Sequence, residues 1–132
     1  MKLLALLPEW PPAQAIALAL NAALLGGLIA RDALEPLLGK TVALEASDLG
    51  VRVRLAYARH GFRAAGRGSA IDLTIKAALP AFLALALRRE DPDTLFFKRR
   101  LVMTGDTDLG LVVKNALDAI DWSRLPWPLR GL

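Results

Sequence analysis

The chain has 132 residues, is 55% hydrophobic with a mean hydropathy of +0.39, and carries a formal net charge of +4. This length suits one domain with a substantial core. With no cysteine and one histidine, the composition excludes a disulfide framework, a thiolate nucleophile and a conventional zinc site. The excess of apolar residues predicts a large core, an exposed patch or a ligand cavity.

The first 37 residues predict two apolar helices. Residues 1–7 form too short an apolar run for a signal peptide. One helix is expected from about Pro12 to Leu25, ending at a pair of glycines, and a second from Arg31 to Leu38. The apolar face of the first would comprise Ile16, Leu20 and Leu24, widened by Leu18 and Leu25. We expect this alanine-rich helix to cover a core or lie on a membrane surface rather than to span a membrane.

From Lys40 the hydrophobic period changes to two, which predicts β-strands. Strands are expected over residues 40–46, 51–58, from Phe62 onward, and over 70–76. In the second of these, odd-numbered positions should face the core while Arg52 and Arg54 face solvent. Between Gly50 and Gly68 lie five arginines and no acidic residue, so anionic head groups, nucleic acid or an acidic protein could bind there; a solvated sheet face would also explain the pattern.

The next segment predicts a helix, a turn and a further strand. A mostly apolar helix is expected from Pro80 to about Arg89, followed by an Asp-Pro-Asp turn. Residues 95–103 are expected to form an apolar strand with a basic centre. On a strand, Arg99 and Arg100 would point to opposite faces, so one of them would pair with Asp106 or Asp108 or meet an acidic head group.

A capped helix is expected to follow that strand. Gly105 permits a tight turn, and Asp106 or Thr107 would accept hydrogen bonds from the first free N–H groups of the helix. The apolar face of this helix would comprise Leu109, Val112, Val113, Ala116, Leu117 and Ile120.

Grouped strands with helices before and after them predict an α+β fold, in which an antiparallel-rich sheet of about five strands is covered on one face by helices. We expect a single domain over residues 1–132. Residues 1–37 would supply apolar N-terminal helices, residues 38–121 the sheet and its covering helices, and residues 122–132 a tail rich in Trp, Pro and Arg.

The segment DPDTLFFKRRLVMTGDTDLGLVVKNALDAID, residues 91–121, resembles the hallmark segment of the SCP2-type (sterol carrier protein 2) lipid-binding domains. Within these it is most similar to the UbiT-type accessory factors of oxygen-independent ubiquinone biosynthesis, because DPDTLFF, RRL, GDT and LGLxVKN occur in the same order and register. From about Leu38 to Lys76 the match is a pattern of strands and turns. The first thirty or so residues match only as apolar and helical.

The resemblance implies an SCP2-like fold around an apolar lipid cavity and no catalysis of its own. The cavity would hold the isoprenoid tail of a quinone precursor and present the head group to biosynthetic enzymes, including UbiU- and UbiV-like hydroxylation proteins. The location implied is the cytoplasm of a bacterium, with peripheral contact with the inner membrane. No cofactor, metal, catalytic residue or nucleic-acid partner is expected.

Two groups of residues are candidates for these roles, although each apolar member would serve equally well as ordinary core. The lipid-binding candidates are Leu73, Ile75, Phe82, Leu83, Phe96, Phe97, Leu101, Met103, Leu109, Val112, Val113 and Leu117. The candidates for head-group or membrane contact are Arg52, Arg54, Arg99, Arg100, Trp122 and Trp127.

Two other functions are compatible with the sequence, and two further ones are disfavoured. The protein could carry fatty acids or phospholipids in general, or it could be a scaffold whose apolar groove binds a partner helix. Nucleic-acid binding is disfavoured because only Tyr57 and Phe62 are interleaved with the arginines, a sparse set for base stacking. An enzyme is disfavoured because His60 lies in a predicted hairpin turn and no catalytic or phosphate-binding motif is present.

Overall fold

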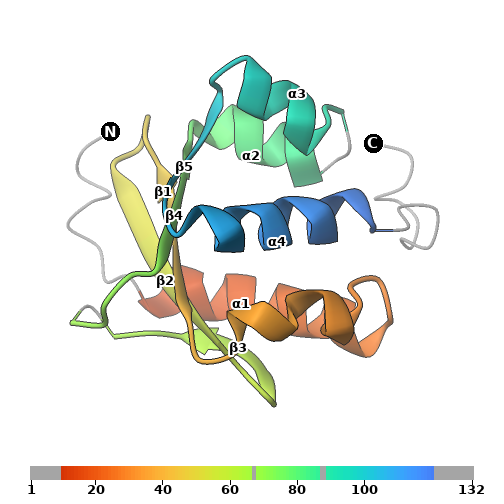
Figure 1. Cartoon of the computed structure of the whole chain (residues 1–132). Helices are drawn as coiled ribbons and strands as arrows, with labels where there is room; N and C mark the ends of the chain where they lie inside the picture. The colour runs from red at the N-terminus through yellow and green to blue at the C-terminus, as the bar shows by residue number, and fades with distance from the viewer. Residues whose placement is uncertain (1–9, 67, 87–88, 121–132) are drawn as a thin grey trace.

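The computed structural model describes residues 10–66, 68–86 and 89–120 (Figure 1). Helices alternate with grouped strands along the chain. The helices are α1 (Trp10–Leu25), the 3-10 helix η2 (Arg31–Leu37), α2 (Leu79–Ala86), α3 (Pro92–Phe97) and α4 (Thr107–Asp118). The strands are β1 (Thr41–Ala46), β2 (Val51–Ala58), β3 (Gly61–Ala64), β4 (Leu73–Ala77) and β5 (Leu101–Gly105).

The five strands form one sheet in the order β3-β2-β1-β4-β5. All neighbouring pairs are antiparallel except β1 and β4, which run parallel. The predicted α+β class and the antiparallel-rich sheet of about five strands are therefore confirmed. The parallel pair arises because the chain leaves β1 through the β2–β3 hairpin and returns on the other side of β1.

The strand register divides the sheet into an apolar face and a polar face. Leu44 stands opposite Val53 on one side and Ile75 on the other, so apolar side chains share one face. The adjacent row, Glu45 between Arg52 and Lys76, lies on the other face. Figure 1 shows the helices gathered on one side of the sheet, the side that the core cluster identifies as apolar. We call these the covered face and the open face.

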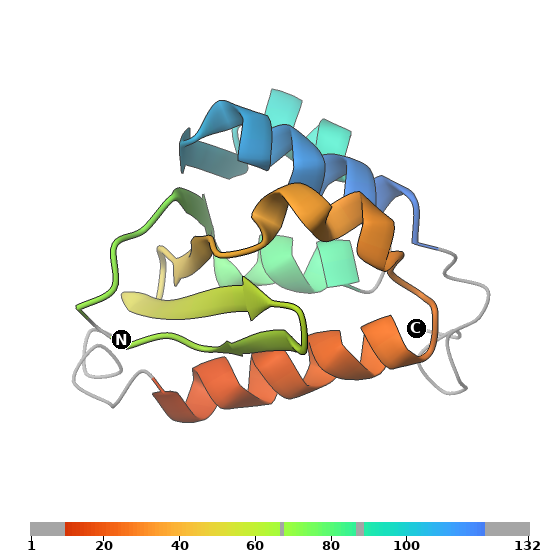
Figure 2. The ribbon, with the colours of Figure 1, turned by 60° about the horizontal axis from the view of Figure 1, so that its bottom comes forward.

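Helix α1 packs on β2 and β3 through small side chains. Ala13 and Ala17 are buried against Val53 and Leu55, which lets the helix approach closely, and Figure 2 shows α1 running alongside β3. Ile16 and Leu20 pack against the same cluster as predicted. The predicted widening of this face was wrong, because Leu18 and Leu25 are 73% and 82% exposed.

The side-chain amide of Asn21 joins α1 to the main chain of β3. Its Nδ2 donates to the Phe62 carbonyl at 2.9 Å, and its Oδ1 accepts from the Phe62 N–H at 2.7 Å. Gly61 is required beside this contact, because it has a φ of +120° and a Cβ there would lie 2.4 Å from Asn21 Oδ1.

The predicted strand over residues 95–103 was wrong in its first half, which forms α3. Asp91 is extended, and Pro92 at the first helical position has its φ already fixed for a helix. The helix ends in a Schellman motif, in which the Arg99 N–H donates to the Phe96 carbonyl at 3.1 Å and the Arg100 N–H to the Leu95 carbonyl at 2.9 Å. β5 begins only at Leu101.

The start of α4 is fixed as the sequence predicts. Asp106 is the N-cap, and its side chain accepts hydrogen bonds from the N–H groups of Asp108 and Leu109 at 3.0 and 3.3 Å. Gly105 precedes it with a φ of +105°, and a Cβ there would meet the Asp72 carbonyl oxygen at 2.6 Å. This close turn allows α4 to fold directly onto the covered face.

Candidate functional site

Nine of the twelve predicted lipid-binding side chains come together between the covered face of the sheet and the helices. Leu73, Ile75, Leu101 and Leu109 are buried in the main core cluster. Phe82, Met103, Val112, Val113 and Leu117 are partly buried and pack against it. The apolar interior at β4, β5, α2 and α4 is thus built from apolar residues that the sequence pattern of strands and helices had identified.

The other three lie outside this interior. Leu83 is 51% exposed, Phe96 47% and Phe97 81%. The two phenylalanine rings contact each other edge to face, with centroids 6.2 Å apart. They are exposed because α3 is a helix whose buried positions are Pro92 and Leu95, which leaves the following two residues on its outer side.

The N-terminal half also contributes to this interior, although none of its residues is among the lipid-binding candidates. Leu24, Ile29, Leu34, Leu37 and Tyr57 belong to the same cluster as the predicted residues. They close the wall opposite β5, and η2 contacts α4 directly. The apolar character of residues 20–38 was visible in the sequence, but nothing in the local pattern indicated that these residues face α4.

Apart from the hydroxyl of Tyr57, the buried side chains of this interior are apolar within the part of the chain that the structure describes. Among the described residues, no charged side chain and no Ser, Thr, Asn, Gln or His side chain is buried. An interior of this kind suits an apolar tail. Beyond the hydroxyl of Tyr57 it has few hydrogen-bonding groups for a head group, which would have to remain at its rim.

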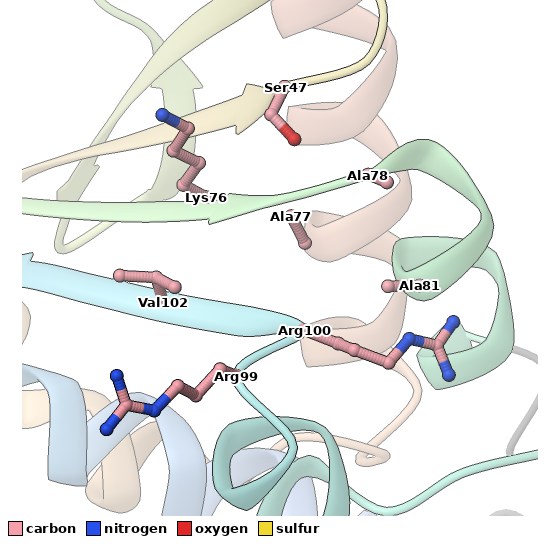
Figure 3. A pocket seen from close by; sticks show the side chains of 8 residues that line it. All are labelled: Ser47, Lys76, Ala77, Ala78, Ala81, Arg99, Arg100 and Val102. Atoms are coloured by element: carbon pink, nitrogen blue, oxygen red, sulfur yellow. The ribbon is translucent and has the colours of Figure 1, made fainter.

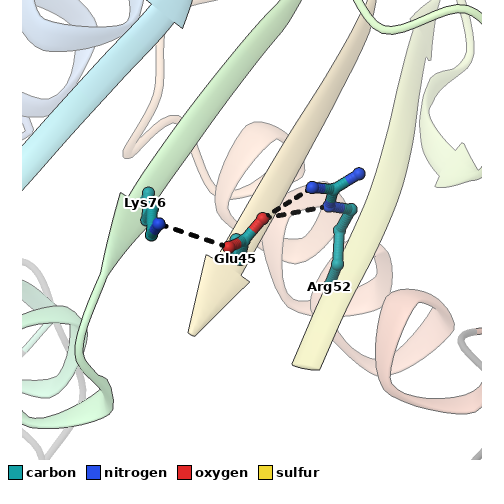
Figure 4. Close-up of polar contacts among 3 residues, drawn as sticks. All are labelled: Glu45, Arg52 and Lys76. Atoms are coloured by element: carbon teal, nitrogen blue, oxygen red, sulfur yellow. Dashed lines mark hydrogen bonds and ion pairs between the residues drawn. The ribbon is translucent and has the colours of Figure 1, made fainter. Parts of the chain in front are cut away.

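The open face carries an ion-pair row across three strands, drawn in Figure 4. Glu45 Oε1 accepts hydrogen bonds from Arg52 Nε at 3.1 Å and Nη2 at 2.8 Å, and Glu45 Oε2 lies 3.8 Å from Lys76 Nζ. Arg52 is therefore already bound to a carboxylate, and its neighbour Arg54 is only partly exposed. Of the two cations predicted for head-group contact on β2, Arg52 is exposed but bound to Glu45, and Arg54 is partly buried.

A partly open cavity of about 320 Å³ lies where the open face meets the turn between α3 and β5. Figure 3 shows Lys76 on one side of it and the side chains of Arg99 and Arg100 extending in different directions on the other. The lining residues are Ser47, Lys76, Ala77, Ala78, Ala81, Arg99, Arg100 and Val102.

The predicted pairing of Arg99 or Arg100 with Asp106 or Asp108 was wrong, because neither arginine lies within a strand. Arg100 Nη1 instead donates to Glu90 Oε2 at 2.7 Å. Arg99 is exposed and forms no ion pair with any side chain in the described ranges. It is also the non-glycine residue with a positive φ, 58°, in that part of the chain.

Lys114 is the group with a resolved pKa shift among these residues. Its Nζ lies 2.8 Å from Asp93 Oδ1 and 3.4 Å from Asp118 Oδ2. The hydrogen bond with Asp93 raises the pKa of Lys114, with a smaller contribution from Asp118. This contact joins α4 to α3 at the surface, outside the apolar interior.

The remaining expectations concern the two tryptophans of the C-terminal tail, metal binding and membrane-spanning helices. Trp122 and Trp127 lie outside the described residues. Within those residues, no group of three or more His, Cys, Asp or Glu side chains could hold a metal ion, and His60 is exposed. None of the helices in the described ranges is long and apolar enough to cross a membrane.

Residues 20–118 match the SCP-2 sterol transfer family. Among curated proteins, the ubiquinone biosynthesis accessory factor UbiT of Escherichia coli strain K12 is 52% identical over 59 residues. That match covers 45% of this chain and 34% of the relative, so the similarity spans about a third of the relative's length.

Solved structures share the fold at low sequence identity. The UbiJ-SCP2 ubiquinone synthesis protein has a TM-score of 0.58 and 20% identity, covering 73% of this chain and 88% of its own. The palmitated SCP2L2 of Aedes aegypti has a TM-score of 0.56 and 14% identity, covering 75% and 87%. At these identities the likeness supports the fold alone.

Proposed function

Because the chain belongs to the SCP-2 sterol transfer family, we propose that it is a non-catalytic lipid-binding accessory protein of ubiquinone biosynthesis. Its apolar interior would hold the isoprenoid tail of a precursor while the head group stays at the rim. The observation that carries this proposal is the convergence of nine predicted apolar side chains, with no buried charged side chain beside them in the described residues.

The physical basis is solubilisation of a long apolar tail. Burial of one CH₂ group contributes about 0.8 kcal/mol, so an isoprenoid chain binds strongly without specific polar contacts. The partly buried residues Met103, Val112 and Val113 lie at the margin of the cluster, where a tail can replace contacts between α4 and the sheet. Presentation then means that the head group is accessible to an enzyme while the tail stays out of water.

The similarity to the Escherichia coli accessory factor supports the biosynthetic context of this proposal. We infer that the partners are the enzymes that modify the quinone ring, including UbiU- and UbiV-like proteins, in the oxygen-independent pathway. We place the protein in the cytoplasm with peripheral contact with the inner membrane. The nine interior residues named above are proposed as the tail-binding surface.

Native mass spectrometry of the purified protein, followed by organic extraction, tests the proposal directly. We expect a co-purifying isoprenoid quinone intermediate. An empty protein that also takes up no added lipid would contradict lipid binding and favour a scaffold that binds a partner helix.

A matched pair of substitutions on α4 links the bound lipid to the interior. Val113→Asp should abolish lipid retention, because it places a carboxylate against the apolar cluster. Leu111→Asp on the same helix should retain lipid, because Leu111 is 56% exposed. Equal retention by both variants, with unchanged thermal stability, would remove α4 from the binding surface.

A general carrier of fatty acids or phospholipids is the second candidate. The palmitated SCP2L2 protein with the same fold favours it. Extraction of a fatty acid or phospholipid, with no quinone intermediate, would select this alternative and keep the same binding surface.

A further inference from the structure

Residues Phe96, Phe97, Lys98, Arg99 and Arg100 form an exposed apolar and basic segment that the lipid-binding interior does not use. We call these five residues the docking tip. Phe97 is 81% exposed and Phe96 is 47% exposed, and the three basic residues that follow are also exposed. Adjacent exposed aromatics cost free energy in water, so a surface of this kind indicates a partner.

We propose that the docking tip attaches the protein to an anionic phospholipid bilayer. The phenylalanine rings would enter the boundary between head groups and acyl chains, while the basic side chains bind lipid phosphates. This proposal rests on the peripheral membrane contact in the proposed function and names the surface that would make it. It does not depend on which lipid the interior holds.

The charge of the docking tip suits a negatively charged surface. Glu90 is the acidic partner of the tip, at 3.8 Å from Lys98 Nζ and 2.7 Å from Arg100 Nη1. The nearby carboxylate of Asp93 is bound to Lys114. Glu90 therefore balances Lys98 and Arg100 in part, and Arg99 has no ion pair among the described side chains.

The cavity beside the docking tip is suited to a lipid phosphate. Arg99 and Arg100 line it together with Lys76 and the hydroxyl of Ser47, over a floor of alanines and Val102 (Figure 3). Lys76 is only loosely paired with Glu45, at 3.8 Å. Arg99 and Arg100 extend in different directions, and Arg100 is bound to Glu90, so a lipid phosphate at this apolar surface would meet Lys76 or Arg99.

The backbone at Arg99 provides a second, independent indication. Arg99 occupies the left-handed position of the Schellman motif that ends α3, with a φ of 58°, where glycine is the residue without steric cost. An arginine at such a position indicates that its side chain has a role that outweighs the local strain.

Co-sedimentation with phosphatidylcholine vesicles, with and without phosphatidylglycerol, tests the docking tip. We expect binding to the anionic vesicles that weakens as salt is raised. Phe97→Ser should lower the partition coefficient about tenfold, from the loss of one buried aromatic ring. Arg99→Gly should lower it about fivefold, from the loss of one cationic contact.

Arg99→Gly distinguishes docking from a structural role. Because glycine relieves the left-handed strain, the variant should be as stable as the wild type or more stable, yet bind vesicles less well. Arg99→Lys should restore most of the binding, because it restores the positive charge. A loss of stability that parallels the loss of binding would contradict a role in docking.

Control variants locate the contact on the molecule. Leu25→Ser removes an equally exposed apolar residue from α1, and Arg63→Gln removes an exposed cation from β3. Neither should alter binding. If Arg63→Gln or Arg54→Glu reduces binding as much as the docking-tip variants do, the open face is the membrane contact and the proposal is wrong.

A fluorescent label measures insertion itself. The chain has no cysteine, so Phe96→Cys introduces one unique site for an environment-sensitive fluorophore. Its emission should shift to the blue with anionic vesicles, whereas a label at Leu25→Cys should not respond. A response to inorganic phosphate alone would show a free-anion site, and a response to an acidic protein but not to vesicles would show a protein interface; either would overturn the proposal.

Discussion

The two faces of the sheet are built from the same strands but have opposite chemistry. Along β4, Leu73, Ile75 and Ala77 are buried under the helices, while Thr74 and Lys76 between them lie on the open face. Along β2, the buried residues Val53, Leu55 and Tyr57 alternate with Arg52, Arg54 and Ala56 in the same way. An apolar inner surface and a charged outer surface thus coexist in strands of five to eight residues.

The difference between the two faces also predicts which positions should tolerate substitution. On the covered face each side chain is packed against several others, so its loss leaves a cavity. On the open face Glu45, Arg52 and Lys76 meet solvent and one another in partly exposed ion pairs, which contribute little to stability.

Adjacent substitutions in β4 should give the largest contrast. Leu73 is 1% exposed, so Leu73→Ala should lower the free energy of unfolding by about 2–5 kcal/mol. Thr74→Ala, one position along on the open face, should change it by less than about 0.5 kcal/mol. Chemical denaturation of both variants, without lipid, measures the contrast. A small effect of Leu73→Ala would indicate that this residue lines a space rather than a packed core.

A loss of stability of intermediate size is expected at the N-cap of α4, which lies over the covered face. Asp106→Ala removes the acceptor for the Asp108 and Leu109 N–H groups and should cost about 1 kcal/mol. Asp106→Asn should retain most of the stability, since an amide oxygen can accept the same bonds. Denaturation midpoints of the two variants provide the comparison, and equal losses would rule out capping as the cause.

The smallest effect is expected on the open face itself. Glu45→Gln weakens the contacts with Arg52 and Lys76, and because these side chains are substantially exposed it should cost at most about 1 kcal/mol. The loss should diminish as salt is raised, because screening already weakens the ion pairs of the wild type. A salt-independent loss would indicate a packing role for the Glu45 side chain.

Much of this architecture could be predicted from local pattern. The period of two identified β2 and β4 and the face that each buries, and the spacing of apolar residues with an acidic cap identified α4. Both signals are set by residues close together in sequence. The parallel pairing of β1 with β4 is a long-range event, and no local pattern reports it.

The errors have identifiable physical causes. Phe96 and Phe97 have high strand propensity, yet Pro92 starts a helix before them, and that wrong assignment also misplaced Arg99. The face of α1 was predicted too wide, because Ile16 and Leu20 pack inward as expected whereas Leu18 and Leu25 are exposed. Its actual contacts use Ala13 and Ala17, since only small residues permit such a close approach to β3.

The paired hydrogen bonds between Asn21 and Phe62 have a consequence for self-association. Phe62 lies on β3, an edge strand whose outward main-chain groups would otherwise be available to a strand from another molecule. The amide of Asn21 occupies them as a neighbouring strand would, and Gln14 Oε1 accepts from the Ala64 N–H, at 3.4 Å, one step along. Helix α1 therefore protects one end of the sheet from edge-to-edge aggregation, and its detachment would expose a template for β-assembly.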